Sequence, residues 1–209
     1  MDAAFFDQWS LDYDEDVIAC DEADIYPFAG YRRTIESILN VVKNYPDAKV
    51  LDLGFGTARL TKKLYDAGFD ISGLDFSPKM CRIARDKMPD AYLACFDFAH
   101  GLPDSFEGRQ FDVILSTYAF HHVPDLLKPE RILEWYNALK PGGVILIGDV
   151  AFADKQALEL CKGQANDEWD ENEDYMVFSS LQASVAHLKP QFEQISHCAG
   201  ILTIHKAKA

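Results

Sequence analysis

A short apolar run followed by two glycines, within residues 49–59, constrains the fold of this chain more than any other stretch. Residues 50–53 (Val-Leu-Asp-Leu) are typical of a buried parallel strand. Gly54 and Gly56 follow this strand, and we expect a helix to begin near Thr57. Glycines let the backbone approach a ligand closely, and a helix N-terminus offers free N–H groups. The stretch therefore predicts a strand, a turn and a helix that bind a nucleotide-like ligand.

Strand and helix patterns alternate along the rest of the chain. This alternation predicts an α/β fold with a doubly wound, Rossmann-like sheet whose crossovers are right-handed. We expect seven strands, mostly parallel, with the last two forming a C-terminal antiparallel hairpin joined around Ala199-Gly200. The expected strands are residues 50–53, 71–74, 91–95, 111–116, 144–147, 192–196 and 201–205. The expected helices are residues 31–44, 57–67, 77–87, 129–139 and 178–188.

Length and composition indicate one domain. With 209 residues, of which 48% are apolar, the chain can bury a full hydrophobic core. We expect a single domain over residues 1–209. It comprises an N-terminal lid and helix (1–45), a ligand-binding core (46–150) and a C-terminal part with helices and the hairpin (151–209).

Charge and cysteine usage limit the possible partners and the compartment. A formal net charge of −14 disfavours nucleic acid, because binding to phosphates depends on clustered Lys and Arg. We therefore expect a small-molecule partner, no membrane span, and a monomer or homodimer. The cysteines are scattered and include no Cys-x-x-Cys pair, and the chain starts without a basic signal segment. These features favour a cytoplasmic protein with neither disulfides nor a zinc site.

Acidic and polar side chains stand at or near the ends of the predicted strands. Ligands of doubly wound sheets bind beyond the carboxyl ends of the strands. We therefore expect residues from five strand ends to line one crevice: Asp52, Asp75, Asp97, the stretch 116–122 and Asp149.

The glycine turn, Asp52-Leu-Gly-Phe-Gly-Thr-Ala58, resembles the first motif of class I S-adenosylmethionine-dependent methyltransferases. Four later stretches resemble further motifs of this family in the expected order: Asp75-Phe-Ser-Pro-x-Met80, Asp97-Phe98, Phe111-Asp-Val-Ile-Leu-Ser116 and Leu139-Lys-Pro-Gly-Gly143. The Trp9…Tyr13-Asp14 start and Tyr118-Ala-Phe-His-His122 are most similar to small bacterial methyltransferases of the YrrT type. The resemblance implies methyl transfer from S-adenosylmethionine to a small-molecule acceptor by in-line displacement.

Two other functions compete with this interpretation. A nicotinamide-dependent oxidoreductase would need Gly-x-Gly-x-x-Gly at the turn, and here Arg59 occupies the position of the third glycine. A non-catalytic S-adenosylmethionine-binding or regulatory protein could share the same fold, because a cofactor pocket does not by itself establish turnover.

The resemblance also implies which residues contact the cofactor. Asp75 would accept hydrogen bonds from both ribose hydroxyls, and Asp97 from the adenine amino group. Asp52 would hold the turn or meet the ammonium group. Many relatives have glycine where this chain has Ala58, and we expect alanine to be harmless if this residue is already helical. The full set of expected cofactor contacts is Tyr13, Asp52, Gly54, Gly56, Asp75, Phe76, Asp97, Phe98 and Ser116.

Candidate catalytic residues follow the fourth strand, where the acceptor would lie. These are Tyr118, His121 and His122. Consecutive residues on a strand extension point to opposite sides, so we expect only one histidine to face the acceptor, and we favour His121. As a general base, His121 would titrate near its ordinary pKa of ~6.5. The alternative is that it only shapes the pocket. We expect the remaining histidines to be surface or packing residues.

Two acidic stretches lie outside these motifs. The N-terminus combines Phe5, Phe6, Trp9 and Tyr13 with many carboxylates, which is typical of a packed amphipathic helix or of a flap that closes over a ligand. Residues 166–174 (Asn-Asp-Glu-Trp-Asp-Glu-Asn-Glu-Asp) are expected to be a solvated connection.

Overall fold

The computed structural model describes the backbone of residues 13–208 and the side chains of residues 16–208. Tyr13 is the first residue of helix α2 (Tyr13–Ala23). The expected lid contacts of Phe5, Phe6, Trp9 and the Tyr13 side chain lie outside the described part of the chain. Among the described residues, no helix is both long enough and apolar enough to cross a membrane.

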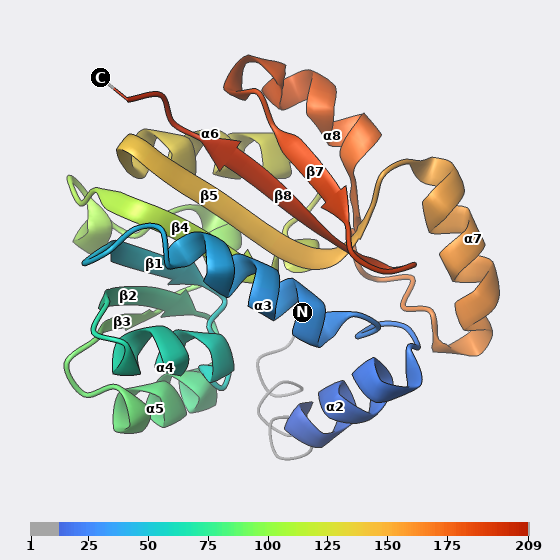
Figure 1. The fold of residues 1–209 in the computed structure, drawn as a ribbon, viewed down its shortest axis with the longest axis horizontal. Helices are drawn as coiled ribbons and strands as arrows, with labels where there is room; N and C mark the ends of the chain where they lie inside the picture. Colours follow the sequence, from blue (N-terminus) through green and yellow to red (C-terminus); the bar gives the residue numbers. More distant parts are fainter. Residues whose placement is uncertain (1–12, 209) are drawn as a thin grey trace.

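One continuous sheet organises the fold (Figure 1). Five strands run parallel: β3 (Tyr92–Cys95), β2 (Asp70–Asp75), β1 (Lys49–Leu53), β4 (Phe111–Thr117) and β5 (Leu139–Phe152), in that spatial order. β8 (Ala199–His205) pairs antiparallel with β5, and β7 (Gln191–Gln194) pairs antiparallel with β8. A two-residue strand, β6 (Met176–Val177), pairs with the end of β5. The mostly parallel sheet with a C-terminal antiparallel hairpin is confirmed. The hairpin turn lies at residues 195–198, earlier than expected.

Helices cover both faces of the sheet (Figure 1). The strands alternate their side chains, so Val113 and Leu115 pack with α3 and α4, while Ile114 belongs to the core beneath α6 and α8. The amphipathic face of α3 contributes Ile35, Ile38 and other buried residues. These helices are α3 (Tyr31–Val42), α4 (Arg59–Asp66), α6 (Lys128–Ala138) and α8 (Phe178–Val185). The remaining helices are α5 (Pro78–Lys87) and α7 (Lys155–Ala165).

The turn between β1 and α4 requires glycine at its first position. Gly54 has a φ of 81°, a left-handed conformation that L side chains rarely adopt. A Cβ added there would lie 2.4 Å from the Cβ of Ala119. The condition on which alanine at position 58 was expected to be harmless is not met: its φ is 64°, and α4 begins only at Arg59. Ala58 therefore holds the left-handed conformation that glycine would adopt without steric cost.

We expect Gly54→Ala to lower the free energy of unfolding by roughly 2–5 kcal/mol, because a left-handed residue costs ~1–2 kcal/mol and overpacking adds ~1–3 kcal/mol. Urea unfolding followed by circular dichroism measures this change. Gly163→Ala is the matched control, since Gly163 lies in α7 and its added Cβ would meet no atom within 4 Å. Equal stability of wild type and Gly54→Ala would contradict the crowding at this turn.

Candidate active site

A cavity of about 910 Å³ lies beyond the carboxyl ends of β1, β2, β4 and β5. It is large enough for a dinucleotide-sized ligand, since ligand pockets typically measure ~300–1,000 Å³. Most of the residues expected from the strand ends meet at its wall: Asp52, Gly54, Gly56, Asp75, Phe76, Asp97, Phe98, Tyr118, His121 and His122.

Asp75, the last residue of β2, is held in place by the backbone of two turns. Its Oδ2 accepts a hydrogen bond of 2.7 Å from the Gly56 amide, and its Oδ1 accepts one of 2.9 Å from the Ser77 amide. A carboxylate oxygen can accept more than one hydrogen bond. Since the bonds fix the carboxylate at the cavity wall, Asp75 could accept hydrogen bonds from ligand hydroxyls without reorganisation.

Asp52 in β1 is buried with one oxygen unsatisfied. The Thr61 hydroxyl donates to Oδ2, whereas Oδ1 has no hydrogen-bond partner among the described residues. Burial raises the pKa of Asp52 to about 7. The hydrogen bond from Thr61 opposes this rise, and the negative charge of Asp75 adds to it. A buried carboxylate with a free oxygen at a cavity wall is suited to a cationic donor.

Asp97 and Phe98 form the edge of the cavity beyond β3. Asp97 caps a 3₁₀ turn (Phe98–His100) by accepting a hydrogen bond of 2.9 Å from the Ala99 amide, and it remains partly exposed. The buried ring of Phe98 lies against Gly54, where an added Cβ would sit 3.2 Å from its Cε1 atom. The pair therefore presents a carboxylate beside an aromatic ring.

Two predicted site residues do not fit their expected roles. Ser116 does not line the cavity: its buried hydroxyl donates 2.8 Å to the Leu53 carbonyl, between neighbouring strands. Tyr118 lines the cavity, but it is packed against the rings of Phe28 and Tyr31. Burial raises the pKa of Tyr118 well above its ordinary value, so its hydroxyl cannot act as a base near neutral pH.

His121 is bound to a buried carboxylate of β5. Its Nδ1 lies 2.6 Å from Oδ1 of Asp149, and its backbone amide donates 3.0 Å to Oδ2. Burial lowers the pKa of His121, but the charge of Asp149 and the hydrogen bond outweigh it, so the pKa is raised overall. The pKa of Asp149 is lowered despite burial, because of His121. The ionised carboxylate therefore accepts from Nδ1–H, and Nε2 remains to accept a proton.

His122 stands beside His121 with a different environment. Burial and the neighbouring charge of His121 lower the pKa of His122, and its Nδ1 lies 2.9 Å from Oε2 of Glu173. The two imidazole rings are 4.0 Å apart at their centroids, and both line the cavity. The expectation that only one faces the cavity is wrong, because the chain forms a 3₁₀ turn (Phe120–His122) instead of extending the strand.

The segment 166–175 is the part of the site that the sequence pattern did not indicate. Trp169 stacks on Tyr26 with a centroid distance of 5.1 Å and lies 4.8 Å from the ring of Tyr175. This packing brings acidic and aromatic side chains to the cavity wall: Tyr26, Glu168, Asp170, Asn172, Glu173 and Tyr175. The segment is exposed along most of its length, as expected of a solvated connection, but the expectation missed that it also lines the cavity. The one sequence feature that indicates packing of this segment is Trp169, an aromatic residue within an acidic run.

Comparison with known proteins identifies the family. A family profile described as a methyltransferase domain matches residues 50–143. The chain is 37% identical over 163 residues to an uncharacterized methyltransferase of Geobacillus sp. strain WCH70, covering 78% of this chain and 73% of that protein. This chain is a class I S-adenosylmethionine-dependent methyltransferase. The methyltransferase is also 36% identical over 160 residues to an uncharacterized methyltransferase of Anoxybacillus flavithermus, covering 77% and 72% of the two chains.

Solved structures agree with the fold of this methyltransferase. The DhpI complex with S-adenosylhomocysteine (SAH) superimposes with a TM-score of 0.69 at 18% identity, covering 99% of this chain and 96% of DhpI. The PH0226 protein from Pyrococcus horikoshii OT3 gives a TM-score of 0.66 at 20% identity, covering 84% and 91% of the two chains. The expected cofactor, S-adenosylmethionine, is confirmed for the methyltransferase, whereas its finer resemblance to the YrrT type stays a prediction.

Proposed function

We propose that this methyltransferase transfers a methyl group from S-adenosylmethionine to a small-molecule acceptor by in-line displacement inside the 910 Å³ cavity. One observation carries the proposal. The same cavity is lined by the carboxylates of Asp52, Asp75 and Asp97 and by the His121 imidazole, which is hydrogen-bonded to Asp149. The residues expected to hold the donor and a proton-accepting group thus line one cavity.

The residues on the β1–β3 side fit the methyl donor. The unsatisfied Oδ1 of Asp52 would receive the ammonium group, and the fixed carboxylate of Asp75 would accept from the ribose hydroxyls. Asp97 would accept from the adenine amino group, beside Phe76 and Phe98. Gly54 lets the turn pass close to Ala119 and Phe98, which line the same cavity. When bound, S-adenosylmethionine supplies a methyl group that its sulfonium already activates.

The residues on the β4–β5 side would position and deprotonate the acceptor. Alignment of donor and acceptor in a dry site can contribute ~7–11 kcal/mol to catalysis. The acceptor must lose a proton. The Nε2 atom of His121 would accept this proton, because the Nδ1 atom is hydrogen-bonded to Asp149. The acidic segment 166–175 lines this side of the cavity.

The charge of the cavity supports an acceptor that carries an amine. Arg59 is the sole Lys or Arg among the described residues that line the cavity, whereas Glu168, Asp170 and Glu173 line its β5 side. The rings of Tyr26 and Tyr175 lie at the same wall and can attract a cation through their faces. A carboxylate or phosphate acceptor would meet repulsion here, so we favour a cationic amine of metabolite size.

The competing functions gain no specific support. A nicotinamide-dependent reaction lacks the third glycine of its turn, since Arg59 opens α4. A regulatory protein that only binds the cofactor would not need a polarised histidine at the opposite wall, and this methyltransferase has the His121–Asp149 pair there.

We expect Asp75→Ala to weaken SAH binding about ten- to hundredfold, since hydrogen bonds to a charged group contribute ~1.5–3 kcal/mol. Isothermal calorimetry with wild type and variant measures the change. Asp104→Ala, an exposed acid outside the cavity, is the matched control. Unchanged affinity in Asp75→Ala would mean that the ribose is held elsewhere, and binding of NAD instead of SAH would overturn the donor assignment.

We expect SAH affinity to rise by roughly fivefold or more between about pH 6 and pH 7.5, because the pKa of Asp52 is about 7 and its ionised form attracts the ammonium group. Above that range the ligand's own amino group loses its proton, so the rise should level off. Calorimetry across this range, compared with Asp52→Asn, measures the effect. A flat profile in wild type would remove Asp52 from the ammonium contact.

The proposed function is tested by incubating the methyltransferase with methyl-labelled S-adenosylmethionine and a deproteinised metabolite extract. We expect label in a cationic small molecule that is chromatographically distinct from unreacted S-adenosylmethionine and that does not form without the enzyme. Label in anionic metabolites would contradict the amine assignment while preserving methyl transfer. No labelled small molecule, with SAH binding intact, would favour the regulatory alternative.

A further inference from the structure

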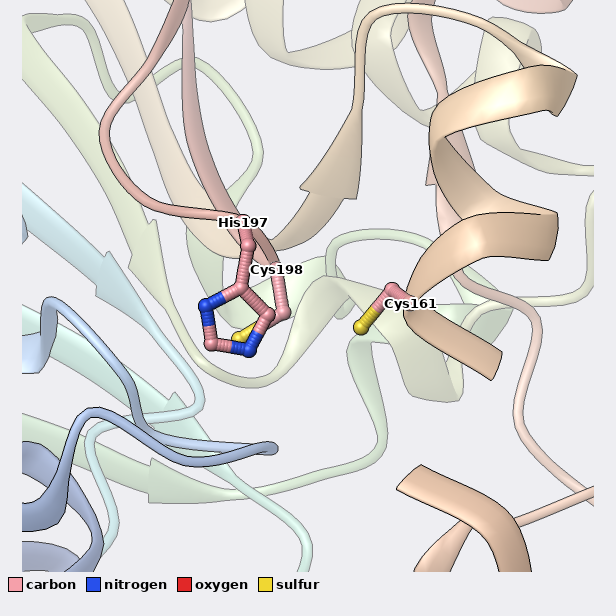
Figure 2. A group of neighbouring side chains, drawn as sticks. All are labelled: Cys161, His197 and Cys198. Atoms are coloured by element: carbon pink, nitrogen blue, oxygen red, sulfur yellow. The ribbon is translucent and has the colours of Figure 1, made fainter. Parts of the chain in front are cut away.

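A second group of side chains, outside the cavity, has the composition of a metal site. We propose that Cys161, His197 and Cys198 bind one transition-metal ion, with Zn²⁺ as the preferred ion. Their potential ligand atoms all lie within 4.8 Å of one another. Figure 2 shows His197 and Cys198 extending from one loop and Cys161 extending toward them from the facing helix. Two thiolates and one imidazole are ligands that Zn²⁺ prefers.

The burial of the three ligands supports metal access and retention. Cys161 and Cys198 are 2% and 0% exposed, whereas His197 is exposed. An ion could therefore enter past the imidazole and reach two thiols that are shielded from solvent. Binding would release both thiol protons to water and leave a fourth position for a water molecule.

The loop that carries two of the ligands is well fixed. The hydroxyl of Ser196 accepts hydrogen bonds from the amides of Cys198 (3.2 Å) and Ala199 (2.9 Å), and it donates 2.6 Å to the Ala29 carbonyl. These bonds hold residues 195–198 against the segment before α3. Among residues 13–208, the imidazole of His197 makes no hydrogen bond or ion pair, so it is available to a metal.

The other thiols and histidines of the described chain are less suited. Cys81 and Cys95 belong to no group of three potential ligands among the described residues. His121 and His122 lie together with Glu173, but each already uses Nδ1 in a hydrogen bond to a carboxylate. The sequence pattern indicated no zinc site because Cys161 approaches the other two ligands only through the fold.

A bound ion would join α7 to the loop before β8. Cys161 and Cys198 belong to the apolar cluster that also contains Tyr26 and Tyr175, two residues of the cavity wall. None of the three proposed ligands lines the cavity itself. We therefore expect a bound ion to stabilise the wall behind the acceptor side, and this effect does not depend on the proposed methyl transfer.

Titration of the reduced, chelator-treated protein with Zn²⁺, in the presence of a coloured competing chelator, tests the proposal. We expect one tightly bound Zn²⁺ per chain and a higher melting temperature in its presence. Replacement by Co²⁺ should give sulfur-to-cobalt charge-transfer absorption and the visible bands of a tetrahedral site. Carboxylate sites elsewhere in an acidic protein cannot produce these cobalt bands, so the bands would identify thiolate ligands. Their absence would overturn the site.

Two variants locate the site without removing the fully buried Cys198. We expect Cys161→Ser and His197→Ala to bind Zn²⁺ at least about tenfold more weakly, since even outer-shell changes cost ~10–100-fold in affinity. Cys95→Ser and His205→Ala, both exposed and outside the group, are the matched controls. Equal affinity in all four variants would contradict the proposal, as would a Cys161–Cys198 disulfide that forms in place of metal binding.

Discussion

Replacement of His121 by glutamine is expected to lower kcat/KM by roughly 10²–10⁴-fold, the usual contribution of a general base. Glutamine keeps polarity and approximate size but cannot accept a proton in this pH range. In wild type, neutral His121 is the active form, so kcat/KM should rise with pH through a pKa above the ordinary 6.5, because Asp149 holds that pKa up. The inflection should be absent in the variant.

His122→Gln is the matched control for this experiment. His122 also lines the cavity, but its lowered pKa leaves it neutral and bound to Glu173. We expect a smaller loss and an unchanged inflection. SAH affinity, measured by calorimetry, should be similar in both variants. A small loss in His121→Gln with the inflection intact would make His121 a wall of the pocket and leave catalysis to alignment alone.

Asp149→Asn is expected to lower kcat/KM by a similar roughly 10²–10⁴-fold, because the amide cannot stabilise a protonated His121 or fix its tautomer as the carboxylate does. Asp149 acts here as a positioning residue. Its removal should lower the pKa of His121 and move the inflection to lower pH, whereas His121→Gln abolishes the inflection. Asp104→Asn, which changes an exposed carboxylate outside the cavity, is the control. An unshifted inflection in Asp149→Asn would contradict the coupling of the pair.

The donor side of the site could be predicted from sequence because its determinants are local. The acids at the ends of β1 and β2 follow directly from the strand and turn patterns, and parallel strands place their carboxyl ends at one edge. Gly54 was recognisable for the same reason, since its turn needs a left-handed residue. The left-handed conformation of Ala58 could not be predicted, because an alanine in the sequence does not indicate a positive φ.

The acceptor side depends on contacts between segments that are distant in the chain. After β4, Tyr118 adopts a φ of 49° and the chain turns into a 3₁₀ helix, so the strand-based alternation of His121 and His122 failed. Asp149 was expected at the crevice, but its bond to His121 required knowledge of the register of β4 and β5. The segment 166–175 reaches the cavity only because Trp169 packs on Tyr26.

A crystal structure of the methyltransferase with SAH tests most directly whether one cavity holds the donor and the acceptor side. We expect the ribose hydroxyls at Asp75, the amino group of the homocysteine moiety at Oδ1 of Asp52, and the sulfur facing the open space in front of His121. Adenosine bound away from Asp75 and Asp97, or a sulfur turned away from His121, would contradict this expectation.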